Sequence, residues 1–182
     1  MLLLEEVGSA PSPTKRAFGN AAFDNRDPSS YLPATMAIRS QSRSAARLAA
    51  VQAMYQMEME GTALPVLLHE FHQHRLGATI EEAEYADAEV SFFDDLVSGT
   101  VKRLEEIDAL IRSKLASGWS LGRLDKPMRG LLRVGTYELL ARKDVPTATV
   151  ISEYLDVADA FYDKREKGFV NGLLDAIAKE VR

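Results

Sequence analysis

The stretch IRSQSRSAARLAAVQAMYQMEME, residues 38–60, decides the fold predicted for this chain. It contains neither glycine nor proline, so nothing in it interrupts a helix. At four-residue spacing Arg39, Arg43 and Arg47 lead along one slowly drifting ridge towards Tyr55. The pattern predicts a buried central helix whose arginines stay free at its start to meet an anion. Close packing on another helix is predicted for a second ridge of mostly small side chains, Ala46, Ala50, Ala53 and Met57.

The composition is that of an ordinary globular protein. Of the 182 residues 46% are apolar and 27% are charged, the net charge is -5, and there is no cysteine. No run approaches the roughly 18 to 20 consecutive apolar residues of a membrane helix, and Leu2-Leu3-Leu4 is followed at once by two glutamates, unlike a secretory signal. The lack of cysteine excludes disulfides, thiolate metal sites and cysteine nucleophiles. We expect a cytoplasmic protein with no membrane contact.

The charge is spread unevenly along the chain. Residues 81–95 contain seven carboxylates and no lysine or arginine, so this segment would repel phosphate. It could meet a basic protein, although a solvated outer face is the preferred interpretation. The start of 38–60 and the segment 164–167 would attract phosphate instead. Nucleic acid, if bound, is expected at a local patch.

The rest of the chain predicts an all-α fold of about seven helices. Residues 1–35, with scattered prolines, are interpreted as a disordered extension before a helical domain at 36–182. Met36 is a candidate translation start, and a cloning remnant is the alternative. No strand pattern is recognised. Further helices are expected at 64–76, from about 81 through 104, at 107–115 either as a continuation or as a separate short helix, from a cap at Asp125, at 147–161 and at 168–181.

Enzymatic chemistry is poorly supported by the residues. His69, His72 and His74 form a cluster, but no second pair of ligands at motif spacing occurs, so a solvated face is preferred to a metal site. Glu138 and Glu153 lie among apolar residues and are predicted to be paired structural acids rather than catalytic ones. No phosphate loop or nucleophile elbow is present. We expect no catalysis, no metal and no cofactor.

Binding of single-stranded RNA is better supported. Arginine makes bidentate contacts to phosphate, and an aromatic ring stacks on an unpaired base. The path from Arg43 to Tyr55 spans roughly 18 Å of helix and suits a few nucleotides. A second basic and aromatic group could flank it: Lys164, Arg165, Lys167 and Phe169.

Several motifs in sequence order resemble the NusB family. AARLAAVQAMYQM is similar to the first helix of the family, LRVGTYELL to its Leu-Arg-x-x-x-Tyr-Glu-Leu segment, DVP to its connecting turn, and GFVNGLLD to its Phe-Val-Asn-Gly-x-Leu-Asp signature. The resemblance covers roughly residues 38–182. It implies two packed three-helix-type bundles, placed at about 38–117 and 118–182.

The resemblance also implies a function without catalysis. NusB proteins pair with the ribosomal small-subunit protein NusE, bind the single-stranded boxA element, and assemble antitermination complexes on RNA polymerase during ribosomal RNA transcription. Some self-associate, so a homodimer is considered. A module for ribosomal RNA maturation and a protein-only helical scaffold are the alternatives. Carried over by motif, the RNA-binding residues are Arg39, Arg43, Arg47, Gln52, Tyr55, Lys167, Phe169 and Asn171.

Three further expectations come from the resemblance. Because of Ser44 and Ala45, this stretch has fewer arginines than the arginine run of many family members, which implies weaker RNA binding without a partner. Phe169 is assigned equally to the RNA face and to the core. The partner-binding candidates, chosen by position in the second bundle, are Met128, Arg129 and Arg133.

Overall fold

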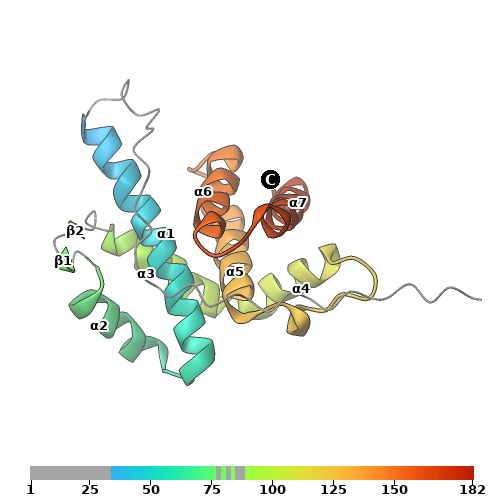
Figure 1. Ribbon diagram of the computed structural model, residues 1–182, viewed down its shortest axis with the longest axis horizontal. Coiled ribbons are helices and arrows are strands. Elements are labelled where there is room, and N and C mark those ends of the chain that lie inside the picture. Colours follow the sequence, from blue (N-terminus) through green and yellow to red (C-terminus); the bar gives the residue numbers. More distant parts are fainter. Residues whose placement is uncertain (1–33, 77–78, 81–82, 85–88) are drawn as a thin grey trace, which may run out of the picture.

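The computed structural model describes residues 34–76, 79–80, 83–84 and 89–182, with side chains from 41–76 and 89–182 (Figure 1). Within these ranges the chain is helical apart from one very short hairpin, so the all-α prediction is confirmed, as is the number of about seven helices. Of the predicted N-terminal extension, residues 1–33 lie outside the described residues, whereas residues 34–35 belong to α1 and correct its predicted end. The helices are α1 (Ala34–Glu60), α2 (Leu64–His74), α3 (Val90–Lys102), α4 (Leu104–Lys114), α5 (Lys126–Ala141), α6 (Thr147–Asp159) and α7 (Lys164–Val181), with a short 3-10 turn at Leu121–Arg123.

The segment between α2 and α3 differs from the prediction. A helix was expected from about Glu81, but α3 begins at Val90, and two short strands precede it, β1 (Thr79–Ile80) and β2 (Ala83–Glu84). They pair antiparallel, with Ile80 opposite Ala83. The β-branched residues at 79–80 favour a strand, while like charges three residues apart in 81–87 disfavour a helix.

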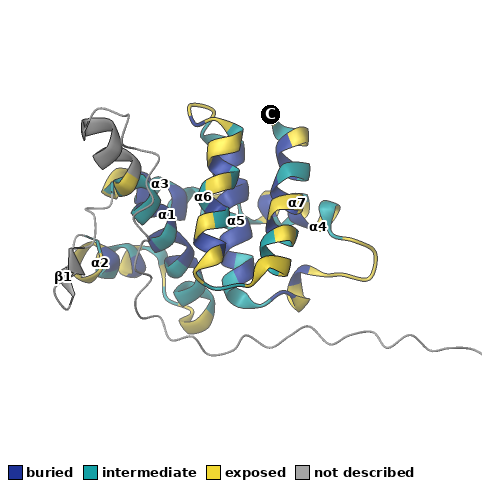
Figure 2. Cartoon of the chain, turned by 45° about the horizontal axis from the view of Figure 1, so that its top comes forward, coloured by how far each residue is buried: buried dark blue, intermediate teal, exposed yellow. Residues whose placement is uncertain are grey.

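Helix α5 lies at the centre of the molecule. Five other helices pack against it, namely α1, α3, α4, α6 and α7, and most of its side chains are buried (Figure 2). Asp125 accepts a hydrogen bond from the Met128 amide 2.8 Å away, which confirms the predicted cap, and Pro127 lies in the first turn. A nearly apolar helix can be covered on all sides only in such a central position.

Helix α1 runs antiparallel to α5, with its middle beside the end of α5. Arg47 bonds to Glu138 near the end of α5, whereas Glu58 bonds to Arg129 near its start. The predicted small-residue ridge is buried, since Ala46, Ala50 and Ala53 are fully covered and Met57 packs against the core. Small side chains allow the two backbones to approach closely: a Cβ atom added at Gly130 would lie 3.3 Å from the Val51 carbonyl oxygen.

Helices α6 and α7 complete the layer around α5. The Tyr162 hydroxyl, after the end of α6, donates to Asp125 at the start of α5. Helix α7 begins at Lys164, one turn before the expected Gly168, and the side chain of Arg182 after its end donates to the Leu139 and Val145 carbonyls. Helix α1 contacts α6 as well as α2 and α3, so the predicted subdomains share one core. Their boundary at 117–118 stays a prediction.

Candidate nucleic-acid interface

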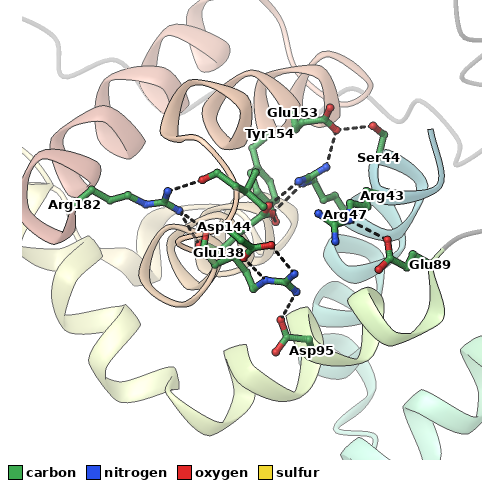
Figure 3. A network of polar contacts seen from close by, with 12 residues as sticks. Arg43, Ser44, Arg47, Glu89, Asp95, Glu138, Asp144, Glu153, Tyr154 and Arg182 are labelled. Atoms are coloured by element: carbon green, nitrogen blue, oxygen red, sulfur yellow. Dashed lines mark hydrogen bonds and ion pairs between the residues drawn. The ribbon is translucent and has the colours of Figure 1, made fainter. Parts of the chain in front are cut away.

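Arg47 is the centre of a buried network between α1, α5 and α6. Its Nε and Nη2 donate to the Glu138 carboxylate at 2.9 and 2.6 Å, and its Nη1 donates to Glu153 at 3.0 Å (Figure 3). The Tyr154 hydroxyl donates to the same Glu138 carboxylate at 2.9 Å, and Ser44 donates to Glu153 at 2.6 Å. This confirms that Glu138 and Glu153 are paired structural acids.

The burial of Arg47 corrects the prediction that the arginine ridge stays free. Arg47 is 2% exposed, because the turn of α1 that carries it lies against α5 and α6. Desolvation opposes its charge, but the hydrogen bond and the charge of Glu138 outweigh that penalty and raise the pKa of Arg47. Burial and the Glu138 charge also hold the pKa of the Tyr154 hydroxyl well above its usual range. In this conformation Arg47 is almost wholly covered, and its bonds hold three helices together, while its role at RNA stays a prediction.

Arg43 lies one turn before Arg47. Of the arginine side chains on this ridge that the structure describes, it is the one that reaches solvent. Its Nε donates to Glu89 at 2.9 Å, and its side chain stays 20% exposed. The guanidiniums of Arg43, Arg47 and Arg142 lie 4.9, 5.1 and 4.9 Å from the centre of the Phe92 ring. Cations over the face of an aromatic ring are attracted to it. The ring of Phe92 therefore gathers positive charge from α1 and from the end of α5.

A shallow pocket of about 210 Å³ opens beside Arg43, at the turn between α5 and α6. Its lining also includes carboxylates, so its charge is mixed. Arg142 bonds to Asp144, and this bond lowers the pKa of that carboxyl to about 2. The lining residues are Arg43, Arg47, Asp144, Val145, Pro146, Thr149 and Glu153.

The other residues of α1 that were predicted to bind RNA are Arg39, Gln52 and Tyr55. The side chain of Arg39 lies outside the described residues. Gln52 and Tyr55 are half-buried, and the Tyr55 backbone lies against α5, since a Cβ atom added at Gly130 would be 3.7 Å from the Tyr55 nitrogen. Their roles at RNA stay predictions.

The predicted group on α7 is not brought together with the arginines. Lys167 pairs with Asp159 at the end of α6 at 2.6 Å, close to the start of α5, whereas Arg47 lies at the end of α5. Phe169 is partly buried and its ring faces Trp119 at 6.2 Å between centroids, while Asn171 is exposed. Arg43 and Arg47 therefore lie at the opposite end of α5 from Lys167, whereas Tyr55 lies beside Gly130 in the first turns of α5.

The predicted partner-binding residues are largely engaged within the chain. Met128 is 4% exposed because it faces the core from the first turn of α5, which corrects its expected position on a partner face. Arg129 pairs with Glu58, and Arg133 pairs with both Glu58 and Asp108. These arginines are half-buried and connect α5 to α1 and α4.

No group of three or more histidine, aspartate or glutamate side chains suited to a metal ion occurs among the side chains that the structure describes. His72 bonds to Asp94 at 2.6 Å, and His69 and His74 are exposed on α2. The described part of the chain also contains no helix long and apolar enough to cross a membrane. Phe92, Arg142 and Trp119 were missed by the sequence reasoning, since their contacts join residues distant in sequence and no motif marks them.

This geometry defines the chain as an all-helical protein whose first helix carries the candidate arginines. The NusB family model matches residues 44–179. A transcription antitermination protein NusB from Sphingopyxis alaskensis is 67% identical over 144 residues, which are 79% of this chain and 97% of the relative. A protein of the same name from Novosphingobium aromaticivorans is 61% identical, over 80% of this chain and 98% of the relative.

Solved structures give the same result. A T. maritima NusB structure is 34% identical with a TM-score of 0.62, covering 76% of this chain and 91% of that one. A crystal structure of the antitermination factors NusB and NusE with double-stranded RNA includes a chain 27% identical, with a TM-score of 0.63 and coverages of 76% and 97%. The chain belongs to the NusB family.

Proposed function

We propose that this protein is a transcription antitermination factor that binds single-stranded boxA RNA together with the ribosomal protein NusE during ribosomal RNA transcription. It acts in the cytoplasm, as part of an antitermination complex on RNA polymerase, by binding rather than by catalysis. The observation that carries the proposal is the identity of 67% over nearly the whole length of a relative named as an antitermination protein.

The geometry supports an RNA contact at the start of α1. Arg43 is held in place by Glu89 and Phe92, yet its side chain stays partly exposed beside an open pocket. A guanidinium fixed in one orientation loses less conformational entropy when it binds a phosphate. The competing carboxylate of Glu89 would weaken binding by the protein alone, which favours a role for a partner.

The proposal is tested by fluorescence anisotropy with labelled boxA RNA and a scrambled RNA, with and without NusE from the same organism. We expect selective binding of boxA that tightens markedly when NusE is present. Equal affinity for both RNAs in both conditions would contradict the proposal. Binding of NusE without any RNA affinity would indicate a protein scaffold.

Replacing Arg43 by alanine is expected to weaken RNA binding and to lower the slope of log K against log salt concentration by up to about one unit, because one phosphate contact is lost. Glu89→Gln should have the opposite effect on affinity, since it removes the competing negative charge. Arg112→Ala is the matched control, because Arg112 is exposed on α4. An Arg43→Ala slope equal to that of the control would exclude the phosphate contact.

A further inference from the structure

Met59 differs from the other methionines whose side chains the structure describes. Its side chain is 51% exposed in the last turn of α1. Met54 and Met128 are only 4% exposed, and Met57 packs against the core. Methionine is usually a core residue, because its thioether and methylene groups are apolar. A dissolved oxidant can therefore reach the Met59 sulfur without any opening of the fold, which the buried methionines require.

The Met59 sulfur also has a cationic neighbour. The Lys126 Nζ, on the first residue of α5, donates to the Met59 Sδ at 3.1 Å. The adjacent Glu58 pairs with Arg129, so the end of α1 is fixed against the start of α5. Lys126 has no carboxylate partner among the residues that the structure describes, and a thioether is a weak acceptor. The ammonium can therefore exchange the sulfur for a better acceptor.

Hydrogen peroxide would meet both groups at this position. The sulfur lone pair attacks one peroxide oxygen, the S–O bond forms as the O–O bond breaks, and the second oxygen leaves as hydroxide. The hydroxide takes the proton of the transferred oxygen, so the products are a sulfoxide and water. The sulfur is oxidised by two electrons and the peroxide is reduced by two. Negative charge develops on the leaving oxygen, and the Lys126 ammonium lies beside the sulfur, where it can donate to that oxygen.

We propose that Met59 is a site of reversible oxidation by hydrogen peroxide, at which Lys126 assists the oxygen transfer and then donates to the sulfoxide oxygen. The proposal does not depend on the proposed function. Oxidation of a core methionine places a polar group among apolar ones and disrupts their packing. At Met59 the new polar group is exposed and has a donor beside it. The fold is therefore kept, and the sulfoxide stays accessible to a methionine sulfoxide reductase.

The order of oxidation tests the site. The full chain is treated with hydrogen peroxide at neutral pH, and site-resolved mass spectrometry follows its six methionines over time. Met59 is expected to be oxidised first among the four described methionines, at least about tenfold faster than Met54 and Met128, because these two react only when the fold opens. Equal rates at Met59 and at either buried methionine would overturn the proposal.

The contribution of Lys126 is tested by substitution. Lys126→Ala should slow the oxidation of Met59 by about two- to tenfold, which is the rate equivalent of one net hydrogen bond. Lys126→Arg should restore the rate, because it keeps a cationic donor. The matched control is Lys102→Ala, since Lys102 is exposed at the end of α3. A Met59 rate in Lys126→Ala that equals or exceeds that of the control would exclude assistance by Lys126.

The oxidised chain tests the remaining steps. With Met59 as the oxidised residue, circular dichroism should show the melting temperature of the parent chain, and the two methionine sulfoxide reductases together should return the chain to its parent mass. Met59→Leu is the control, because it keeps an apolar side chain of similar size and lacks the sulfur. A lower melting temperature on oxidation of Met59 would contradict the retained fold. A sulfoxide that neither reductase removes from the folded chain would contradict reversibility.

Discussion

Arg47→Ala is expected to lower the free energy of unfolding by about 3 to 5 kcal/mol, because removing one partner leaves a buried charge uncompensated. Glu138 is fully buried and would lose two of its hydrogen bonds, keeping the one from Tyr154. Glu153 would lose a bond at the same time. The network joins α1 to α5 and α6, so the loss acts on the packing of three helices.

Urea denaturation followed by circular dichroism measures this effect. Arg43→Ala is the matched control: the same substitution, one turn earlier, removes a partly exposed pair with Glu89, and we expect a loss of no more than about 1 kcal/mol. The two variants should also differ in RNA binding per folded molecule, which Arg43→Ala reduces directly. Equal stability of the two variants would contradict the structural role of Arg47.

Gly99→Ala is expected to destabilise the protein by about 1 to 3 kcal/mol, by overpacking. A Cβ atom at this position of α3 would lie 2.0 Å from the Tyr137 ring and 2.1 Å from its hydroxyl oxygen. The ring cannot move aside easily, because the Tyr137 side chain on α5 is buried and its hydroxyl donates to Asp95 at 2.8 Å. The gain in helix propensity of roughly 1 kcal/mol does not offset such a clash.

The matched control is Gly172→Ala on α7, where no heavy atom lies within 4 Å of the added Cβ. Here the same substitution should stabilise the chain by about 0.4 to 1 kcal/mol. The double variant Gly99→Ala, Tyr137→Leu should lose less stability than the sum of the losses of the two single variants. Leucine is smaller than tyrosine and leaves room for the added Cβ atom at position 99. Strict additivity in thermal or urea denaturation would contradict the predicted clash.

Periodicity and turn residues in the sequence predicted most of the helices. Asp125 identified the start of α5, because capping is a local property. The sequence predicted a central position for residues 38–60, whereas the helix at the centre is α5. The hairpin at 79–84 was missed, since a pair of two-residue strands has no period to detect. The start of α7 was misplaced by four residues because Gly168 was taken as a boundary, although a helix tolerates glycine on an open surface.

The site was predicted less well than the fold, for a physical reason. A basic residue near a helix start has the same local pattern whether it faces solvent or a buried carboxylate. Arg43 and Arg47 differ only in what α5 and α6 bring against them, which is a tertiary property. The cations around Phe92 and the rings around Trp119 likewise come from segments distant in the sequence.

The pairing of Arg47 with Glu138 has a consequence for biosynthesis. The two residues are 91 positions apart. At roughly 5 to 20 residues per second, a ribosome needs on the order of 5 to 20 s to add the second after the first. During that interval α1 has been made but lacks the helix that covers its small-residue face. The uncovered face of α1 is therefore accessible to chaperones and proteases until α5 is complete.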